Sequence, residues 1–350
     1  MAPPAYRGST WRNSAALTQW ISRARREQAL EPDLPIIDPH HHLWDDGRGR
    51  YLLDEVLADI GGGHNVTQTV FIECRANYRF DGPEALKPLG EVEFVNGVAA
   101  SSASGNYGPT RIATGIVGQA DLRLGAAVED TLTRQLALTG GRFKGIRWSI
   151  PHDPHPEIGN FVAHYVEPGI SQDPTWRQGY AQLGKLGLTF EGWCYHPQIP
   201  ELSVLAHAFP DVTIILDHVG GFIGVGPYAA RRDEEFLRWK RSLVELASHR
   251  NVVCKLGGLG MAVFGFDVHD KPVPPSSETL AGLWRPFIET CIDAFGVDRC
   301  MFESNFPVDK QSCDYTACWN AFKRITAGAS AAEKAALDHD TAARVYRLPV

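Results

Sequence analysis

Short apolar runs recur along the chain, and most are followed by a segment with helical periodicity. Eight runs are rich in β-branched or aromatic residues, at positions 36–38, 66–73, 112–117, 143–148, 188–195, 212–217, 252–256 and 300–303. Continuous apolar runs of this length are typical of parallel strands that are buried on both faces. The pattern therefore predicts eight parallel strands.

Between these runs lie segments with apolar residues at helical spacing and charged opposite faces, most clearly at positions 121–138, 174–186, 231–249 and 276–295. Strands that alternate with helices indicate an α/β protein, a single (β/α)₈ TIM barrel. An open doubly wound sheet is the alternative, but no G-x-G-x-x-G sequence follows the first strand. We expect the barrel to span residues 35–350, after an N-terminal helical extension at 1–34.

The extension should hold one helix, at positions 11–30. Two loops are expected to be long, at 75–99 and at 257–276, and the second is rich in glycine and proline. In a barrel, the loops that follow the strands surround the active site.

Composition narrows the class of protein. The net charge of -7 gives no reason to expect nucleic acid or an anionic membrane as a partner. Seven cysteines without a C-x-x-C pair suit reduced thiols in the cytosol. Residues 1–7 lack the apolar core of a signal peptide, and no run of 18 apolar residues exists. We expect a cytoplasmic protein that acts on a small molecule.

The most informative motif is DPHHHLW at positions 38–44. On an extended backbone, alternate side chains share a face, so Asp38, His40 and His42 point the same way. Two imidazoles at the end of a strand form a compact pair of nitrogen ligands, which predicts a divalent metal. His41 should face the opposite side. Asp38 either orients a ligand imidazole or forms an ordinary strand hydrogen bond.

Polar residues also end several other predicted strands. They are Glu73 on the second strand, Lys144 and Arg147 on the fourth, His196 after the fifth, His218 after the sixth and Glu303 on the eighth. In a barrel these positions meet at one face, where catalytic groups gather. Arg147 should bind a carboxylate, from a substrate or from within the protein, because an unpaired buried guanidinium is costly. Glu73 is either a metal ligand or a partner of such a cation, Arg147 or Lys144.

Six segments in order resemble the amidohydrolase superfamily, and more narrowly its amidohydrolase-2 lactonases: IIDPHHHLWD, FKGIRW, YHPQIPEL, LDHVGG, CMFESNFPVDK and TAARVYRL. The resemblance covers residues 35–348. It implies a distorted (β/α)₈ barrel with one or two metal ions. It also implies that His40, His42, His196 and His218 bind the metal.

The chain departs from the family pattern on the eighth strand. The family usually has an aspartate there, in a G-S-D-W-P-like segment, that touches the metal and transfers protons. Here the corresponding position is Asn305. An amide oxygen coordinates a metal weakly and does not accept a proton at neutral pH. Glu303, which has the same strand parity, or Glu73 would have to replace that carboxylate.

Two reaction types follow from this departure. A zinc-type hydrolase would attack a small lactone, ester or amide, one that bears a carboxylate if Arg147 binds it. A non-haem dinuclear iron or manganese oxygenase is the alternative, because it would tolerate loss of the hydrolytic aspartate. A decarboxylase and a non-catalytic subunit paired with a homologue are weaker hypotheses. By analogy with other barrels, a homodimer is also expected.

Overall fold

The computed structural model describes residues 12–159 and 167–349. Eight of its strands form one parallel sheet in the order β1-β4-β5-β6-β7-β8-β9-β10. Their bounds are β1 Pro35–His41, β4 Asn65–Ile72, β5 Arg111–Gly118, β6 Phe143–Ser149, β7 Thr189–Trp193, β8 Ile214–Leu216, β9 Val252–Leu256 and β10 Cys300–Phe302. A small antiparallel pair, β2 Trp44–Asp46 and β3 Gly49–Tyr51, follows β1. The eight parallel strands predicted from the apolar runs are confirmed.

The barrel closes through the residues that follow β10. The backbone N–H of His42 donates to the Phe306 carbonyl at 2.8 Å, and that of Asn305 donates to the His40 carbonyl at 3.0 Å. The Asp38 carboxylate accepts a further hydrogen bond from the Ser304 N–H, also at 3.0 Å. Closure of the barrel therefore brings two segments that are far apart in the sequence, 38–42 and 303–306, into direct contact.

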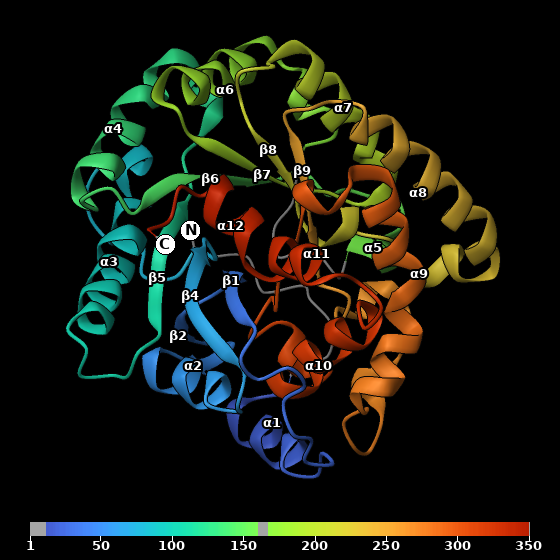
Figure 1. Cartoon of the computed structure of the whole chain (residues 1–350). Coiled ribbons are helices and arrows are strands. Elements are labelled where there is room, and N and C mark those ends of the chain that lie inside the picture. The colour runs from blue at the N-terminus through green and yellow to red at the C-terminus, as the bar shows by residue number, and fades with distance from the viewer. Residues whose placement is uncertain (1–11, 160–166, 350) are drawn as a thin grey trace.

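Helices surround the barrel, as Figure 1 shows. Their bounds are α1 Ser14–Ile21, α2 Leu53–Ile60, α3 Leu89–Ala103, α4 Val128–Leu138, α5 Pro156–Gly159, α6 Pro174–Leu186, α7 Ile199–Ala208, α8 Arg232–Ala247, α9 Ser277–Phe295, α10 Tyr315–Ile325, α11 Ala331–Ala335 and α12 Thr341–Val345. Each barrel strand is followed by one of the longer helices, so the fold is a (β/α)₈ barrel. Within the described residues, no helix has the length and apolar character needed to cross a membrane.

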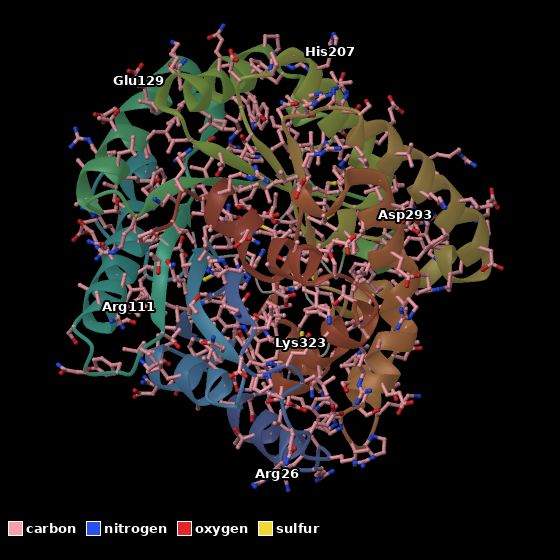
Figure 2. The ribbon with its side chains drawn as sticks, viewed as in Figure 1. Arg26, Arg111, Glu129, His207, Asp293 and Lys323 are labelled. Atoms are coloured by element: carbon pink, nitrogen blue, oxygen red, sulfur yellow. The ribbon has the colours of Figure 1, made fainter. Side chains whose placement is uncertain are left out.

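Two apolar layers stabilise the barrel. The larger lies between strands and helices, and polar residues such as Arg111, Glu129, His207 and Asp293 point outward from it (Figure 2). The smaller fills the amino-terminal end of the barrel, where strand residues including Ile37 and Val253 pack against the C-terminal segment. In Figure 1, α12 lies across the barrel centre. The C-terminal segment therefore plugs one end of the barrel.

The N-terminal helix is shorter than predicted. Trp11 lies outside the described residues, and α1 ends at Ile21 instead of reaching position 30. The segment that follows α1 is hydrogen-bonded to α10 instead. The Leu30 and Glu31 carbonyls accept from Lys323 Nζ at 2.8 and 2.9 Å. These long-range bonds replace the internal hydrogen bonds that a continued helix would form.

The predicted loop at 75–99 is also partly wrong, because α3 begins at Leu89. Buried residues of α3 recur every three or four positions, as Leu89, Val92, Val95 and Ala99 do. The two glycines in that helix weaken its sequence pattern. The loop at 257–276 agrees with prediction and holds two short 3₁₀ turns, Ala262–Phe264 and Val268–Asp270.

Candidate metal centre

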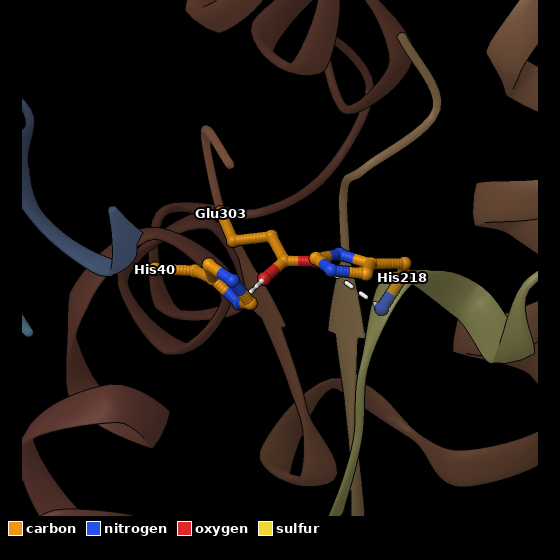
Figure 3. Close-up of side chains that lie close together, drawn as sticks. All are labelled: His40, His218 and Glu303. Atoms are coloured by element: carbon orange, nitrogen blue, oxygen red, sulfur yellow. Dashed lines mark hydrogen bonds and ion pairs between the residues drawn. The ribbon is translucent and has the colours of Figure 1, made fainter. Parts of the chain in front are cut away.

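Three buried side chains from distant parts of the chain meet at the carboxyl end of the barrel. His40 lies in β1, His218 follows β8 and Glu303 follows β10. One nitrogen or oxygen of each lies within 4.8 Å of the others. Figure 3 shows the Glu303 carboxylate between the two imidazole rings. We call these three residues the His40 cluster.

Glu303 determines which nitrogen of His218 has the proton. Its Oε1 lies 2.7 Å from His218 Nδ1 and also accepts from the His218 backbone N–H at 3.2 Å. A carboxylate only accepts, so Nδ1 of a neutral His218 is protonated and Nε2 keeps a lone pair. His218 therefore offers Nε2 as a ligand nitrogen.

The protonated nitrogen of His42 is set in the same way, by a hydrogen bond at Nδ1. Its Nδ1 lies 2.8 Å from the Ile72 carbonyl oxygen, so Nε2 again keeps the lone pair. The His40 ring centroid lies 4.9 Å from that of His42 and 4.6 Å from that of His218. His41 faces away, with Nε2 2.8 Å from Thr69 Oγ1. The structure thus brings His40, His42 and His218 together and leaves His41 outside.

His40 has four charged neighbours. Lys255 Nζ lies 3.2 Å from Nδ1, Arg147 Nη1 lies 3.3 Å from Nε2, Glu303 Oε2 lies 2.7 Å from Nδ1, and Asp217 Oδ1 lies 3.7 Å from Nδ1. A neutral imidazole has one acceptor nitrogen, so only one of the two cations donates to it. Nδ1 lies between Lys255 and Glu303, and Nε2 is the nitrogen nearest to Arg147.

Burial lowers the pKa of His40 well below its usual value, and the charges of Lys255 and His218 add to this effect. Burial, followed by the Arg147 charge, likewise lowers the pKa of His42 well below its usual value. Both rings are therefore neutral near pH 7. Neutral imidazole is the form that binds a metal ion.

Below the cluster lies a buried layer of charges. Lys255 Nζ is 2.8 Å from Glu191 Oε2 and 3.5 Å from Asp217 Oδ1, and all three side chains are fully enclosed. Burial raises the pKa of Glu191 well above its usual value. Glu191 lies within β7, Thr189–Trp193, whereas His196 follows the end of that strand.

Arg147 is bound within the protein. Its Nε lies 2.9 Å from Glu73 Oε1, and its Nη2 donates to the Glu73 backbone carbonyl. Glu73 therefore takes the role of cation partner, and it does not belong to the His40 cluster. Glu73 thus engages two of the three guanidinium nitrogens, Nε and Nη2. The third, Nη1, is the one nearest to His40.

His196 also lies outside the cluster. Its Nδ1 accepts from the Ile223 backbone N–H at 3.1 Å, and Nε2 lies 3.1 Å from Glu235 Oε2. Both ring nitrogens are thus used by protein groups, and the ring stacks on Phe222 at 5.1 Å between centroids. His196 joins the loop after β7 to the loop after β8 and to α8.

Asp38 and Lys144 lie outside the His40 cluster and form hydrogen bonds that hold neighbouring segments together. Asp38 accepts from Tyr315 Oη at 2.9 Å as well as from Ser304, and burial raises its pKa to about 6. It therefore fastens the motif to the neighbouring segment and orients no imidazole side chain. Lys144 Nζ donates to the Arg347 carbonyl at 3.3 Å, which ties β6 to the C-terminal plug.

Sequence reasoning missed Asp309. Asn305 Nδ2 donates to Asp309 Oδ1 at 2.8 Å, and the Gly260 N–H donates to Asp309 Oδ2 at 2.8 Å. Burial raises the pKa of Asp309 to about 7. The loop after β9 packs tightly here, because a Cβ on Gly258 would collide with the His218 ring. The only sequence clue was the second carboxylate in the segment ESNFPVDK, after Glu303.

The residues present fit a divalent cation. Neutral imidazole nitrogens with a carboxylate suit zinc, iron or manganese. Glu303 Oε2 and both Asp217 oxygens are buried without a well-aligned hydrogen-bond donor. Lys255 Nζ lies 3.5 Å from Asp217 Oδ1 and 4.0 Å from Glu303 Oε2, and a bound cation would further compensate these buried oxygens. His40, His42, His218 and Glu303 are the residues that would hold the ion.

Comparisons with known proteins identify relatives of this chain. Residues 37–348 match the family model described as amidohydrolase. The uncharacterized protein y4mH of Sinorhizobium fredii is 36% identical over 338 residues, which cover 90% of this chain and 99% of the relative. The L-fucono-1,5-lactonase of Burkholderia multivorans is 27% identical and is matched over 89% of this chain and 96% of its own.

Solved structures show the same fold. A Burkholderia multivorans amidohydrolase with bound HEPES has a TM-score of 0.69 at 24% identity, covering 90% of this chain and 99% of the other. A zinc-bound structure of an amidohydrolase from the same species has a TM-score of 0.67 at 25% identity and the same coverage. From the family match over nearly the whole chain and the shared barrel, the chain belongs to the amidohydrolase family.

Proposed function

We propose that the protein is a metal-dependent hydrolase that opens a small lactone or cleaves a related ester or amide. The observation that supports this most directly is the packing of His40, His42 and His218 beside the buried Glu303 carboxylate. The 27% identity to a lactonase favours a sugar lactone as the substrate class. The described residues contain one such cluster, which favours a single ion.

When bound, a divalent ion would polarise the substrate carbonyl and lower the pKa of a bound water. The protein's own residues then have separate tasks. His42 and His218 present Nε2, because the Ile72 carbonyl and Glu303 hold their Nδ1 protons. Trp193 packs edge-on against the His218 ring at 4.9 Å between centroids and restricts its rotation.

Glu303 is our candidate for the group that accepts the proton of the attacking water. Its Oε1 is fixed by His218, whereas Oε2 receives no well-aligned hydrogen bond. Oε2 therefore retains a lone pair beside the histidines. Glu73 is less suitable because Arg147 engages its Oε1. A general base of this kind contributes roughly 10²–10⁴-fold to the rate.

The experiment combines metal analysis with lactone hydrolysis. Protein purified without added metal is analysed for zinc, iron and manganese, and is then assayed on sugar 1,5-lactones including L-fucono-1,5-lactone. We expect about one zinc per chain, and hydrolysis that a chelator abolishes and zinc restores. Hydrolysis that is unaffected by complete metal removal would overturn the proposal.

A matched pair of variants tests the ligand assignment. His42→Ala should lose the metal and the activity. His41→Ala, which removes the neighbouring ring that contacts Thr69, should keep the metal stoichiometry. Equal metal loss in both variants would contradict the assignment of His42.

The same measurements separate the alternatives predicted from the sequence. Two iron or manganese ions per chain, with oxygen uptake, would favour the oxygenase. A fully metal-loaded protein without turnover would favour the non-catalytic subunit, and sedimentation of the purified chain would then test for a homodimer or a missing partner. A carboxylate on the substrate stays a prediction, because Arg147 is already paired with Glu73.

A further inference from the structure

We propose that Asp309 is a positioning residue that sets the orientation of the Asn305 side-chain amide beside the histidines. The part of the proposal that concerns a metal ion rests on the proposed function. The pairing of the two side chains stands on their own contacts.

Asn305 and Asp309 are joined twice. The Asn305 amide nitrogen Nδ2 donates to Asp309 Oδ1 at 2.8 Å, and the Asp309 backbone N–H donates to the Asn305 carbonyl at 3.1 Å. Both side chains are almost fully enclosed, with exposed fractions of 1%. A hydrogen bond from an amide to a buried carboxylate is stronger than one between neutral groups.

The direction of this bond fixes the amide. The Gly260 N–H and Asn305 Nδ2 each donate to one oxygen of Asp309, so the NH₂ group of Asn305 faces Asp309 and its oxygen Oδ1 faces away. Among the described residues, none donates to that oxygen. The Asn305 backbone is itself bonded to the His40 carbonyl at 3.0 Å. The amide oxygen thus belongs to a residue whose backbone is bonded to His40, and it is left for a cation or a bound water.

Asp309 cannot move away from Asn305, because the loop after β9 holds it from the other side. The Gly260 N–H donates to Asp309 Oδ2 at 2.8 Å. A Cβ at position 260 would lie 2.8 Å from Asp309 Cγ, so only glycine permits this approach. The carboxylate is therefore fixed between Gly260 and Asn305.

The pairing explains why position 305 has an amide. An aspartate at 305 would oppose the Asp309 carboxylate at the distance of the present hydrogen bond. Two carboxylates this close do not both ionise. One amide and one carboxylate form a stable pair whichever of positions 305 and 309 holds the amide. The arrangement decides which of the two groups stands at position 305.

Three variants test this: Asp309→Asn, Asn305→Asp and the double exchange. Asparagine and aspartate both tolerate the positive φ of 55° at position 305, so the backbone is preserved. Zinc affinity is measured by competition with a chelator, thermal unfolding on metal-free protein, and kcat/KM on a lactone. Asp309→Asn should weaken zinc binding about 10–100-fold. Asn305→Asp should unfold at a lower temperature, increasingly so from pH 6 to 8, and the double exchange should restore the unfolding temperature and zinc binding.

Asp338→Asn is the matched control. Asp338 is equally buried at 1% exposed, burial raises its pKa to about 7 as well, and it lies in the segment 336–340 at the other end of the barrel. It should change zinc affinity less than twofold.

Wild-type zinc affinity in Asp309→Asn, or a double exchange no more stable than Asn305→Asp, would overturn the positioning role. If the wild-type protein binds no zinc, the proposed function fails. The unfolding comparison on metal-free protein still decides whether the two side chains are paired.

Discussion

The two ends of the barrel interior are filled in opposite ways. At the amino-terminal end, Ile37, Val70 and Val253 pack against Val345 and Tyr346 of the C-terminal segment. At the carboxyl-terminal end, the same strands present histidines, carboxylates and two cations. Apolar packing stabilises a fold, whereas buried charges usually destabilise it unless they are fully paired. The difference indicates that the plug stabilises the barrel and that the charged end is retained for its chemistry.

One chain of hydrogen bonds and an ion pair joins the two ends. Tyr346 Oη of the plug donates to Glu191 Oε1, and Glu191 Oε2 lies 2.8 Å from Lys255 Nζ, which in turn lies 3.2 Å from His40 Nδ1. The plug therefore also satisfies a polar group of the charged layer. Variants at each end should separate stability from activity.

The largest effect is expected for Glu303→Gln. A glutamine keeps the volume, but it cannot accept the proton and it offers one acceptor oxygen where Glu303 has two. We expect kcat/KM to fall by roughly 10²–10⁴-fold, with a midpoint of thermal unfolding close to that of the wild type. Steady-state kinetics on a lactone and calorimetry measure the two quantities. Turnover at the wild-type rate would show that Glu303 only orients the imidazoles.

An intermediate effect is expected for Tyr346→Phe at the opposite end. The substitution removes the donor to the fully buried Glu191 and should lower the free energy of unfolding by about 1–3 kcal/mol. The value of kcat/KM should change little. Urea unfolding and kinetics check both expectations.

Tyr315→Phe is the matched comparison. Tyr315 Oη donates to Asp38, which is bonded to the Ser304 N–H next to Glu303. A similar loss of stability is expected, but here zinc affinity and kcat/KM should fall as well. If both tyrosine variants affect activity equally, the two ends are not functionally distinct.

The smallest effect is expected from His64, which precedes β4 at the amino-terminal end. Burial, aided by the Lys323 charge, lowers its pKa to about 4. The unfolded chain takes up a proton near the ordinary pKa of about 6.5, whereas the folded protein does not until about pH 4. Stability should therefore decrease as the pH falls through this window, and His64→Asn should reduce the slope. An unchanged slope in urea titrations would mean that the pKa of His64 is the same in the folded and unfolded chain.

The sequence predicted the strands well, because a barrel strand buried on both faces is an uninterrupted apolar run. It also predicted which of the adjacent histidines share a face, since His42 directly follows β1 and keeps its alternation. His196 shows where this reasoning ends. It follows β7, but a turn intervenes, and the direction of its ring depends on Ile223 and Glu235. Neither partner can be inferred from a local pattern.

Asp309 and Glu73 show the same limit for carboxylates. The residue types and their places near strand ends are visible in the sequence, but their partners are not. Glu73 is bonded to Arg147, which lies 74 positions away, and Asp309 is fixed by Gly260 from another loop. Which carboxylate remains free for chemistry depends on these pairings.

By itself, the sequence determined the alternation of strands and helices, the pair His40 and His42, and the family. These features depend on local periodicity and on short motifs. The tertiary structure decided that Glu303 lies between His40 and His218, and that Asn305 is held by Asp309. The physical reason is the closure of the barrel, which brings β1 against the residues after β10 and places groups more than 250 positions apart in contact.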